Sequence, residues 1–288
     1  MLKSNGLLVD FYFACIGEFV LSRQTVNYRT IEDQLRDTLV RLSLPIFKGS
    51  GIILLVNRYI FEHLIYPVAQ RTMDRAKFYD TIRNAPFNGL LSQSQVEGME
   101  SILNFWEKPP VKPTGEFADN WDIRTVNWLA YMLATVFHET AFTMQPIDEG
   151  GGDAYFTRLY EGRKGLGNTE SGDGAKFHGR GFVQLTGRAN YHKFTDIVRE
   201  FYPECPDLTA SPASVKKDEY ASVIMFYGMF CGSFTGLALK NFLGDPEKGQ
   251  IEDFYNARKV INALNKADVI QSYAKKFNTA LNSAGATA

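Results

Sequence analysis

The helical run over residues 121–142, rich in apolar residues, constrains the fold of this chain more than any other segment. Trp128, Met132 and Val136 recur at a spacing of four residues, which is typical of a helix that buries one face in a core. Strand signals are few and short: the best covers residues 182–185, and a small hairpin is expected near it. The sequence therefore predicts a mainly α fold with a small β element.

Other helical patterns lie on both sides of this run. One helix is expected around Phe78 and Ile82, and another after a capping box formed by Ser92 and Gln95. Four more are expected over residues 191–201, 218–230, 251–264 and 269–281. Residues 31–44 also show helical spacing, but they belong to a segment, residues 1–72, that carries no recognisable chemistry. Its His63 is interpreted as a packing or surface residue. We expect an N-terminal extension of unknown role over residues 1–72, followed by a catalytic domain over residues 73–288.

Composition excludes several function classes. The net charge of −1 and the scattered basic residues give no basic patch, so no nucleic-acid partner is expected. Cys15, Cys205 and Cys231 are far apart and odd in number, which argues against a disulfide framework and a cysteine zinc site and favours synthesis in a reducing compartment. Acidic residues interrupt residues 7–21, the nearest candidate for a membrane span or secretory signal, so neither is expected.

Glu139 is the first candidate for chemistry. It follows Val136 by three residues and so lies at the border of the apolar face of its helix. Partial desolvation there would raise the pKa of a carboxyl and keep it protonated, as a general acid requires. The alternative is a surface glutamate at a helix end. His138-Glu139 also matches the start of the zinc-protease motif H-E-x-x-H. That motif requires a second histidine at position 142, which is Phe142 in this chain, so a zinc-protease site is excluded.

Two further carboxylates, Asp148 and Glu149, come just before a run of three glycines, residues 150–152. Glycines let a loop move and approach a ligand closely, so one of these carboxylates is expected to face Glu139 across a cleft. A solvated acidic turn is the alternative.

A glycine-dense segment, residues 162–181, comes after these carboxylates. It lacks the order of a phosphate-binding loop, and its glycines are interpreted as turn-formers around Asn168 and Asp173. After it come Gln184, Thr186 and Asn190, whose donors and acceptors suit sugar hydroxyls and a bound water.

Taken in order, these segments resemble the family 19 glycoside hydrolases, which are chitinases and related phage endolysins. The resemblance covers roughly residues 73–281. It is carried by His138-Glu139-Thr140, Gly-Leu-Gly-Asn at 165–168, Ser-Gly-Asp-Gly at 171–174, Gly-Arg-Gly at 179–181 and Gln-Leu-Thr-Gly-Arg-Ala-Asn-Tyr at 184–191. Residues 144–147 and 257–262 are similar to the phage and prophage branch. Ala263 departs from the family, which often has glycine there.

The resemblance implies a lysozyme-like, two-lobed helical domain and a set of roles. Glu139 would be the general acid, Glu149 or Asp148 the base, and Thr186 the hydroxyl that helps to place the attacking water. We favour Glu149 as the base and expect Asp148 to anchor the loop through nearby backbone amides. The implied substrate-binding residues are His138, Gln184, Asn190, Tyr191, Arg258 and Asn262. Family members hydrolyse with inversion, which needs carboxyl groups about 6.5–9.5 Å apart and neither metal nor organic cofactor.

The function expected is therefore an endolysin-type glycoside hydrolase that cleaves β-1,4 bonds of peptidoglycan. A chitinase with the same mechanism, and a phage component that binds sugar without catalysis, are the alternatives. A monomer is expected, held in the bacterial cytoplasm and acting on the cell wall in the periplasm, with a holin as a candidate partner for export.

Overall fold

The computed structural model describes residues 73–110, 123, 125–244 and 252–286. Over this part the fold is mainly α, as the sequence predicts, with a two-stranded sheet as its small β element. The N-terminal extension, with residues 31–44 and His63, lies outside the described residues, so the boundary after residue 72 stays a prediction. Within the described part, the helices are all too short or too polar to cross a membrane.

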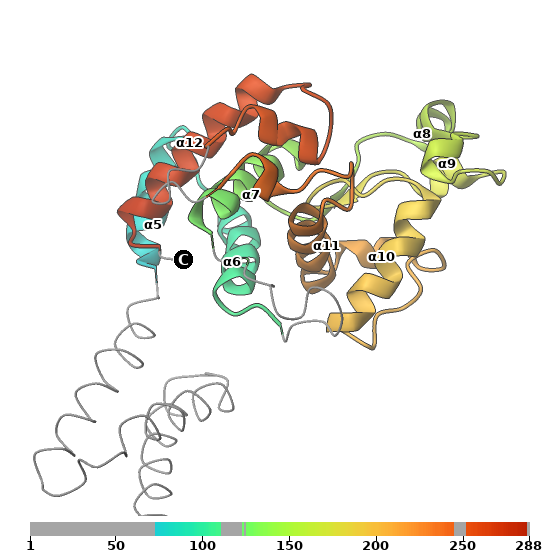
Figure 1. Cartoon of the computed structure of the whole chain (residues 1–288), viewed down its shortest axis with the longest axis horizontal. Helices are drawn as coiled ribbons and strands as arrows, with labels where there is room; N and C mark the ends of the chain where they lie inside the picture. The colour runs from blue at the N-terminus through green and yellow to red at the C-terminus, as the bar shows by residue number, and fades with distance from the viewer. Residues whose placement is uncertain (1–72, 111–122, 124, 245–251, 287–288) are drawn as a thin grey trace, which may run out of the picture. The chain divides into compact units, whose positions relative to one another are not determined.

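Helix α7 (Val126–Glu139) is the centre of the core (Figure 1). Residues 127–137 are all buried, as befits a helix that is covered on every side. Helix α12 (Ala267–Ser283) packs along it, where Phe137 meets the rings of Tyr273 and Phe277 with centroids 4.8 and 6.0 Å away. The helix is shorter than the apolar run, because the backbone at Ala141 and Phe142 turns to positive φ and leaves the helical region.

The first two described helices agree with their local signals. Helix α5 (Arg75–Asn84) is capped by Asp74, whose carboxylate accepts from the Lys77 amide at 3.0 Å. Helix α6 (Gln93–Glu107) begins with the predicted capping box, in which Ser92 and Gln95 each bond the backbone amide of the other.

The sheet joins two segments that are distant in sequence. Strands β1 (Ile147–Asp148) and β2 (Arg180–Gly181) pair antiparallel, with Asp148 opposite Arg180. The predicted strand over residues 182–185 is wrong, because φ at Gly181 is 84° and at Gln184 is 54°, and these values bend the chain into a turn. An Arg180–Leu185 bridge closes this turn and forms the small hairpin that was expected.

The remaining elements form the second half of the domain. They are α8 (Asp153–Tyr160), η2 (Lys164–Leu166), α9 (Asp173–Lys176), α10 (Arg188–Phe201), η3 (Pro212–Lys216), α11 (Asp218–Cys231), η4 (Leu239–Asn241) and η6 (Asn256–Val260). Figure 1 shows α5, α6, α7 and α12 grouped on one side and α8, α9 and α10 on the other, with α11 between them. This arrangement agrees with the two-lobed domain that the resemblance implies.

The helices predicted over residues 191–201, 218–230 and 269–281 are confirmed as α10, α11 and α12. The helix predicted over 251–264 is wrong: residue 251 lies outside the described part, and residues 252–264 contain only one short helix, the 3-10 helix η6. Arg258 lies in this short helix, and its side chain points into the protein and is 2% exposed.

The glycine-dense segment is held by buried polar contacts. The Asn168 side chain accepts from the Arg188 amide at 2.8 Å, and the Arg188 guanidinium donates twice to Asp173, at 2.9 and 2.5 Å. These bonds to Arg188, together with backbone amides, hold the pKa of Asp173 below its usual range despite burial. Gly167 and Gly172 turn the chain at φ of 71° and 89°, which confirms the expected turns around Asn168 and Asp173.

Candidate active site

Glu139 lies at the last position of α7, where the buried helix reaches the surface. Its side chain is 19% exposed, which fits the border position that the sequence indicates. Its Oε1 lies 2.7 Å from Nη1 of Arg258, whose side chain is almost wholly buried. The Arg258 Nε also donates to the carbonyl of Asn265 at 3.0 Å. Arg258 is thus buried against Glu139, and the sugar contact that the resemblance implies for it stays a prediction.

His138 precedes Glu139 and is half-buried. Burial lowers its pKa, with Arg258 and Lys266 acting in the same direction and Glu139 opposing them. The imidazole is therefore neutral near pH 7 and offers one donor and one acceptor. That chemistry suits the sugar contact predicted for it.

The loop between Glu139 and the acidic pair carries backbone strain. Ala141, Phe142 and Met144 all have positive φ, at 49°, 69° and 58°, although none is glycine. The Thr140 hydroxyl holds this loop, donating to the Val136 carbonyl at 2.7 Å and accepting from the Met144 amide at 3.1 Å. Strained non-glycine residues concentrate at functional sites, where the surrounding structure holds them in place. Their position between the candidate acid and base supports this segment as the site.

Asp148 contacts two cationic side chains and a histidine ring. The Arg180 Nε donates to its Oδ1 at 2.9 Å, Lys216 contacts its Oδ2, and the His178 ring lies 3.5 Å away. Burial alone would raise the pKa of Asp148, but Lys216 and Arg180 together lower it. Asp148 thus anchors β1 to β2 and η3, as an anchoring residue was expected to do. Its partners are cationic side chains rather than the backbone amides we predicted.

Glu149 has a different environment. The Tyr160 hydroxyl donates to both of its carboxylate oxygens, at 2.8 and 3.0 Å, and the Gly179 amide donates to Oε2 at 3.1 Å. A methyl group added at Gly179 would meet this oxygen at 3.1 Å. Glu149 therefore packs against the backbone of Gly179, where there is no side chain, and neutral donors orient its carboxylate. In the described part, the cations that hold Asp148 make no ion pair with Glu149.

Gln184, Thr186 and Asn190 form a chain of hydrogen bonds beside these carboxylates. The Gln184 amide donates to the carbonyls of Ile147 and Gly181, at 3.3 and 3.0 Å, so its oxygen remains as the acceptor for a ligand. Thr186 donates to the Gln184 carbonyl at 2.8 Å, and Asn190 donates to the Thr186 carbonyl at 2.8 Å. The lone pairs of the Thr186 hydroxyl are left to accept from a water, as its predicted role requires.

Two predicted substrate ligands stand apart from this group. Tyr191 is 0% exposed, accepts from Arg180 Nη1 at 2.8 Å and donates to the His178 carbonyl at 2.8 Å. It therefore supports Arg180 from within the core, and the sugar contact that the resemblance implies for it stays a prediction. Asn262 is exposed after η6, and its side-chain oxygen accepts from the Ala263 amide at 2.8 Å. No contact joins it to Glu149 or Gln184 in the described part.

Three residues of this site, Tyr160, Arg180 and Lys216, were not predicted from the sequence. Arg180 lies inside a motif that carries the resemblance, so that motif was the available signal. Tyr160 and Lys216 come after Asp148 and Glu149 at long separations without any pattern, and only the fold brings them there.

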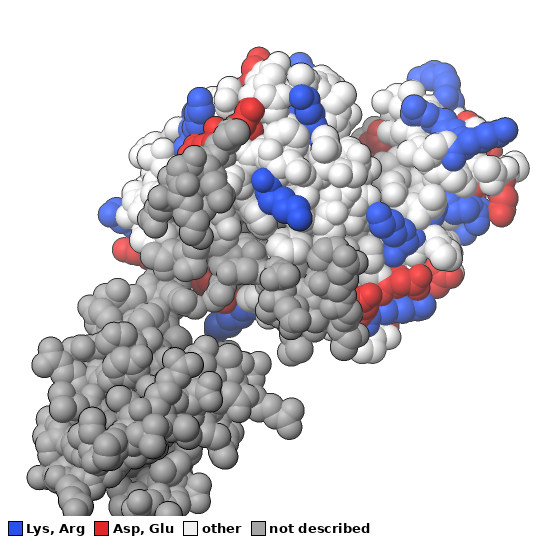
Figure 2. Space-filling model, viewed as in Figure 1, with Lys and Arg blue, Asp and Glu red and all other residues white. Residues whose placement is uncertain are grey.

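The surface of the described part carries charges of both signs. On the face shown in Figure 2, side chains of both signs occur, with several Lys and Arg residues over the part that holds α8 and α9. Within the described ranges, no group of three or more His, Cys, Asp or Glu side chains is arranged to hold a metal ion.

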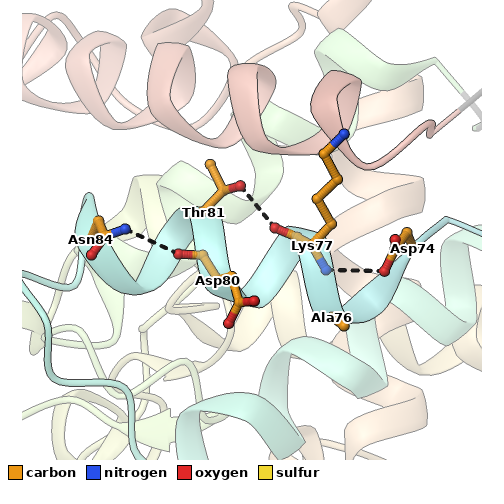
Figure 3. A pocket seen from close by; sticks show the side chains of 6 residues that line it. All are labelled: Asp74, Ala76, Lys77, Asp80, Thr81 and Asn84. Carbon is orange, nitrogen blue, oxygen red and sulfur yellow. Dashed lines mark hydrogen bonds between the residues drawn. The ribbon is translucent and has the colours of Figure 1, made fainter.

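A hollow on the surface of α5 is unrelated to these residues (Figure 3). Its polar side chains bond their own helix: Thr81 donates to the Lys77 carbonyl at 2.8 Å and Asn84 to the Asp80 carbonyl at 3.4 Å. It is an ordinary helix surface and carries no candidate chemistry.

Comparisons with known proteins give partial support to the family resemblance. No protein family profile matches the chain. Over 48 residues it is 46% identical to a glycosyl hydrolase family 19 domain-containing protein of Haemophilus influenzae. That stretch is 16% of this chain and 24% of the relative, so the chain matches about a quarter of the relative's length.

Two solved structures are similar to this chain. Chitinase C from Streptomyces griseus has a TM-score of 0.40 and 21% identity, covering 76% of this chain and 94% of its own. A mutant of chitinase C has a TM-score of 0.39 and 20% identity, with 76% and 78% covered. Because fold likeness does not determine function, the chemistry must come from the residues of this chain.

Proposed function

We propose that this chain is a glycoside hydrolase that cleaves β-1,4 bonds of peptidoglycan by an inverting acid/base mechanism. The observation that carries the proposal is the contrast between two carboxylates. Glu139 is paired with the buried Arg258 at the end of α7, whereas among the described residues the donors to Glu149 beside β2 are all neutral. An acid and a base need carboxylates in different environments, and on this proposal Glu139 must leave the Arg258 guanidinium to carry its proton, because a cation favours the ionised carboxyl. The local likeness to a family 19 protein supports the same interpretation.

Glu139 is the proposed acid. It would protonate the leaving glycosidic oxygen from the end of a rigid core helix. Such a helix holds a group more precisely than a loop does. The half-buried, neutral His138 beside it would contact the sugar.

Glu149 is the proposed base. It would take a proton from a water on the opposite face of the sugar, while the Thr186 hydroxyl accepts a hydrogen bond from that water. Asp148 is the weaker candidate, because Arg180 and Lys216 hold its carboxylate and lower its pKa, so it is a poor proton acceptor. The Gln184 oxygen and Asn190 would bind sugar hydroxyls or N-acetyl groups next to this water.

The biological setting comes from the substrate. A peptidoglycan hydrolase of this kind would be an endolysin of a phage or prophage. It would wait in the bacterial cytoplasm, reach the periplasm with the help of a holin, and act there as a monomer on the cell wall. A chitinase would use the same residues on a neutral polymer.

Two assays on the purified full chain separate these alternatives. Clearing of a peptidoglycan suspension without release of chitin oligosaccharides is the expected result, and the reverse result would establish the chitinase.

Glu139→Gln should lose activity at least 100-fold, within the range that general acid catalysis contributes. Because this change also leaves Arg258 without its charged partner, circular dichroism must show that the variant is folded. A folded variant with wild-type activity would remove Glu139 from the mechanism.

The stereochemistry is a separate test. NMR of the first product from a β-linked substrate should show the α anomer, because a water between base and sugar attacks from the opposite face. A β anomer that appears first would refute inversion.

A further inference from the structure

Two buried hydroxyl groups precede Glu139 along α7. Tyr131 and Thr135 come eight and four residues before Glu139, so the three residues lie along one side of the helix. Both side chains are 0% exposed. Within the described residues, neither hydroxyl has a well-formed hydrogen bond. Buried polar groups without partners are rare and destabilise a fold, so a pair of them beside a candidate acid needs an explanation.

Arg258 offers unused donors in the same place. A guanidinium carries five N–H groups, and that of Arg258 is withdrawn from water. Its Nε donates to the Asn265 carbonyl, but its Nη1, although 2.7 Å from Glu139, lacks a hydrogen bond of good geometry. In the described part of the chain, a donor of Arg258 and the two hydroxyls on the Glu139 side of α7 thus all lack hydrogen bonds of good geometry.

Both charges of the ion pair influence the Tyr131 hydroxyl. Burial raises the pKa of Tyr131 to about 12; the Thr135 hydroxyl, which lies near it without a hydrogen bond of good geometry, and Arg258 lower this pKa, and Glu139 raises it. The hydroxyl of Tyr131 therefore keeps its proton at any working pH and has lone pairs free to accept from a guanidinium.

We propose that Tyr131 and Thr135 form a second binding place for the Arg258 guanidinium, occupied when Glu139 turns to the substrate. A general acid must carry a proton, and a protonated carboxyl no longer holds a guanidinium by charge. A buried cation left without a partner is strongly unfavourable. Two oxygen acceptors beside it lower the free energy of that state and so ease the release of Glu139. Tyr131 and Thr135 are thus positioning residues that act through Arg258.

This inference rests on the proposed function, since the release of Glu139 belongs to its role as the acid, but its main test needs no substrate. Urea unfolding of the full chain is measured for Glu139→Gln, for Tyr131→Phe with Thr135→Val, and for the three changes together. We expect Glu139→Gln to reduce the folding equilibrium constant at least tenfold more in the background without the two hydroxyls than in the wild type, which is about 1.4 kcal/mol of coupling. Equal effects in the two backgrounds would overturn the proposal.

A matched control comes from Ser222 on α11, another buried hydroxyl without a hydrogen-bond partner in the described part. Ser222→Ala should show no coupling to Glu139→Gln. If the triple variant fails to fold, a crystal structure of Glu139→Gln decides. The proposal expects Arg258 within hydrogen-bond distance of both hydroxyls, and a guanidinium that stays beside position 139 would contradict it.

Kinetics give a second readout. In the variant with Tyr131→Phe and Thr135→Val, kcat should fall at least tenfold while KM stays within twofold, and Ser222→Ala should retain kcat. A purely structural defect would lower the melting temperature without this selective fall in kcat at nearly constant KM. A wild-type chain that cleaves neither polymer would refute the proposed function, whereas absence of coupling in unfolding would refute this inference alone.

Discussion

The hydroxyl of Tyr160 provides the sharpest test of which carboxylate is the base. It donates to both oxygens of Glu149, at 2.8 and 3.0 Å. Burial, together with Glu149, raises the pKa of Tyr160 above its usual range, so the hydroxyl always acts as a donor. A hydrogen bond to a charged group contributes about 1.5–3 kcal/mol. If this energy orients the base in the transition state, Tyr160→Phe should lower kcat by about 10- to 150-fold.

The assay is the initial rate on the polymer that the wild type cleaves, with KM and melting temperature measured alongside. Tyr155→Phe is the matched control, because Tyr155 lies on the same helix, is exposed, and its hydroxyl takes no part in this hydrogen-bond set. Its rate should equal that of the wild type.

A second variant reports on the rival base. Lys216→Met removes a cation that holds Asp148 and should leave kcat within about threefold if Glu149 is the base. A folded Tyr160→Phe variant with wild-type kcat, beside a large loss in Lys216→Met, would refute the reasoning and move the base to Asp148.

Three further outcomes are expected. The pKa of Asp148 is lowered in the folded state, so its contribution to stability is present at neutral pH and is lost as the pH falls through that lowered value. The free energies of unfolding of the wild type and Asp148→Asn should therefore converge below about pH 4, and a constant difference down to pH 2 would contradict this. Asp173→Asn breaks a pair in which Asp173 is 1% exposed and should cost about 3–5 kcal/mol in urea unfolding, whereas the exposed control Asp153→Asn should stay within about 0.5 kcal/mol. A chain that begins at Met73 should fold and cleave, and an insoluble or inactive product would show that residues 1–72 complete the core.

Local signals identified most of the helices correctly. The capping box of Ser92 and Gln95 was readable because both hydrogen bonds join residues three apart. Helix α7 was readable because its apolar residues recur at the helical period. Such features depend on a few neighbouring residues, so the sequence alone contains them.

The two wrong elements failed for non-local reasons. Residues 182–185 are apolar enough for a strand, but the pairing of Arg180 with Asp148 and Leu185 bends them into a turn. Residues 251–264 have helical spacing, but burial of Arg258 beside Glu139 leaves only a short 3-10 helix. In both places a contact with a distant residue overrides the local preference.

The candidate site divides in the same way. The sequence by itself selected Glu139, the acidic pair, Gln184, Thr186 and Asn190, because residue type and order are enough to nominate groups that can move protons or bind sugars. Only the tertiary structure decided what surrounds each of them: that Arg258 pairs with Glu139, that cations hold Asp148, that Tyr160 orients Glu149, and that Tyr191 is buried. These contacts join residues far apart in the chain, and they form only when α7, α8, η3 and η6 are packed together. No local pattern encodes that packing.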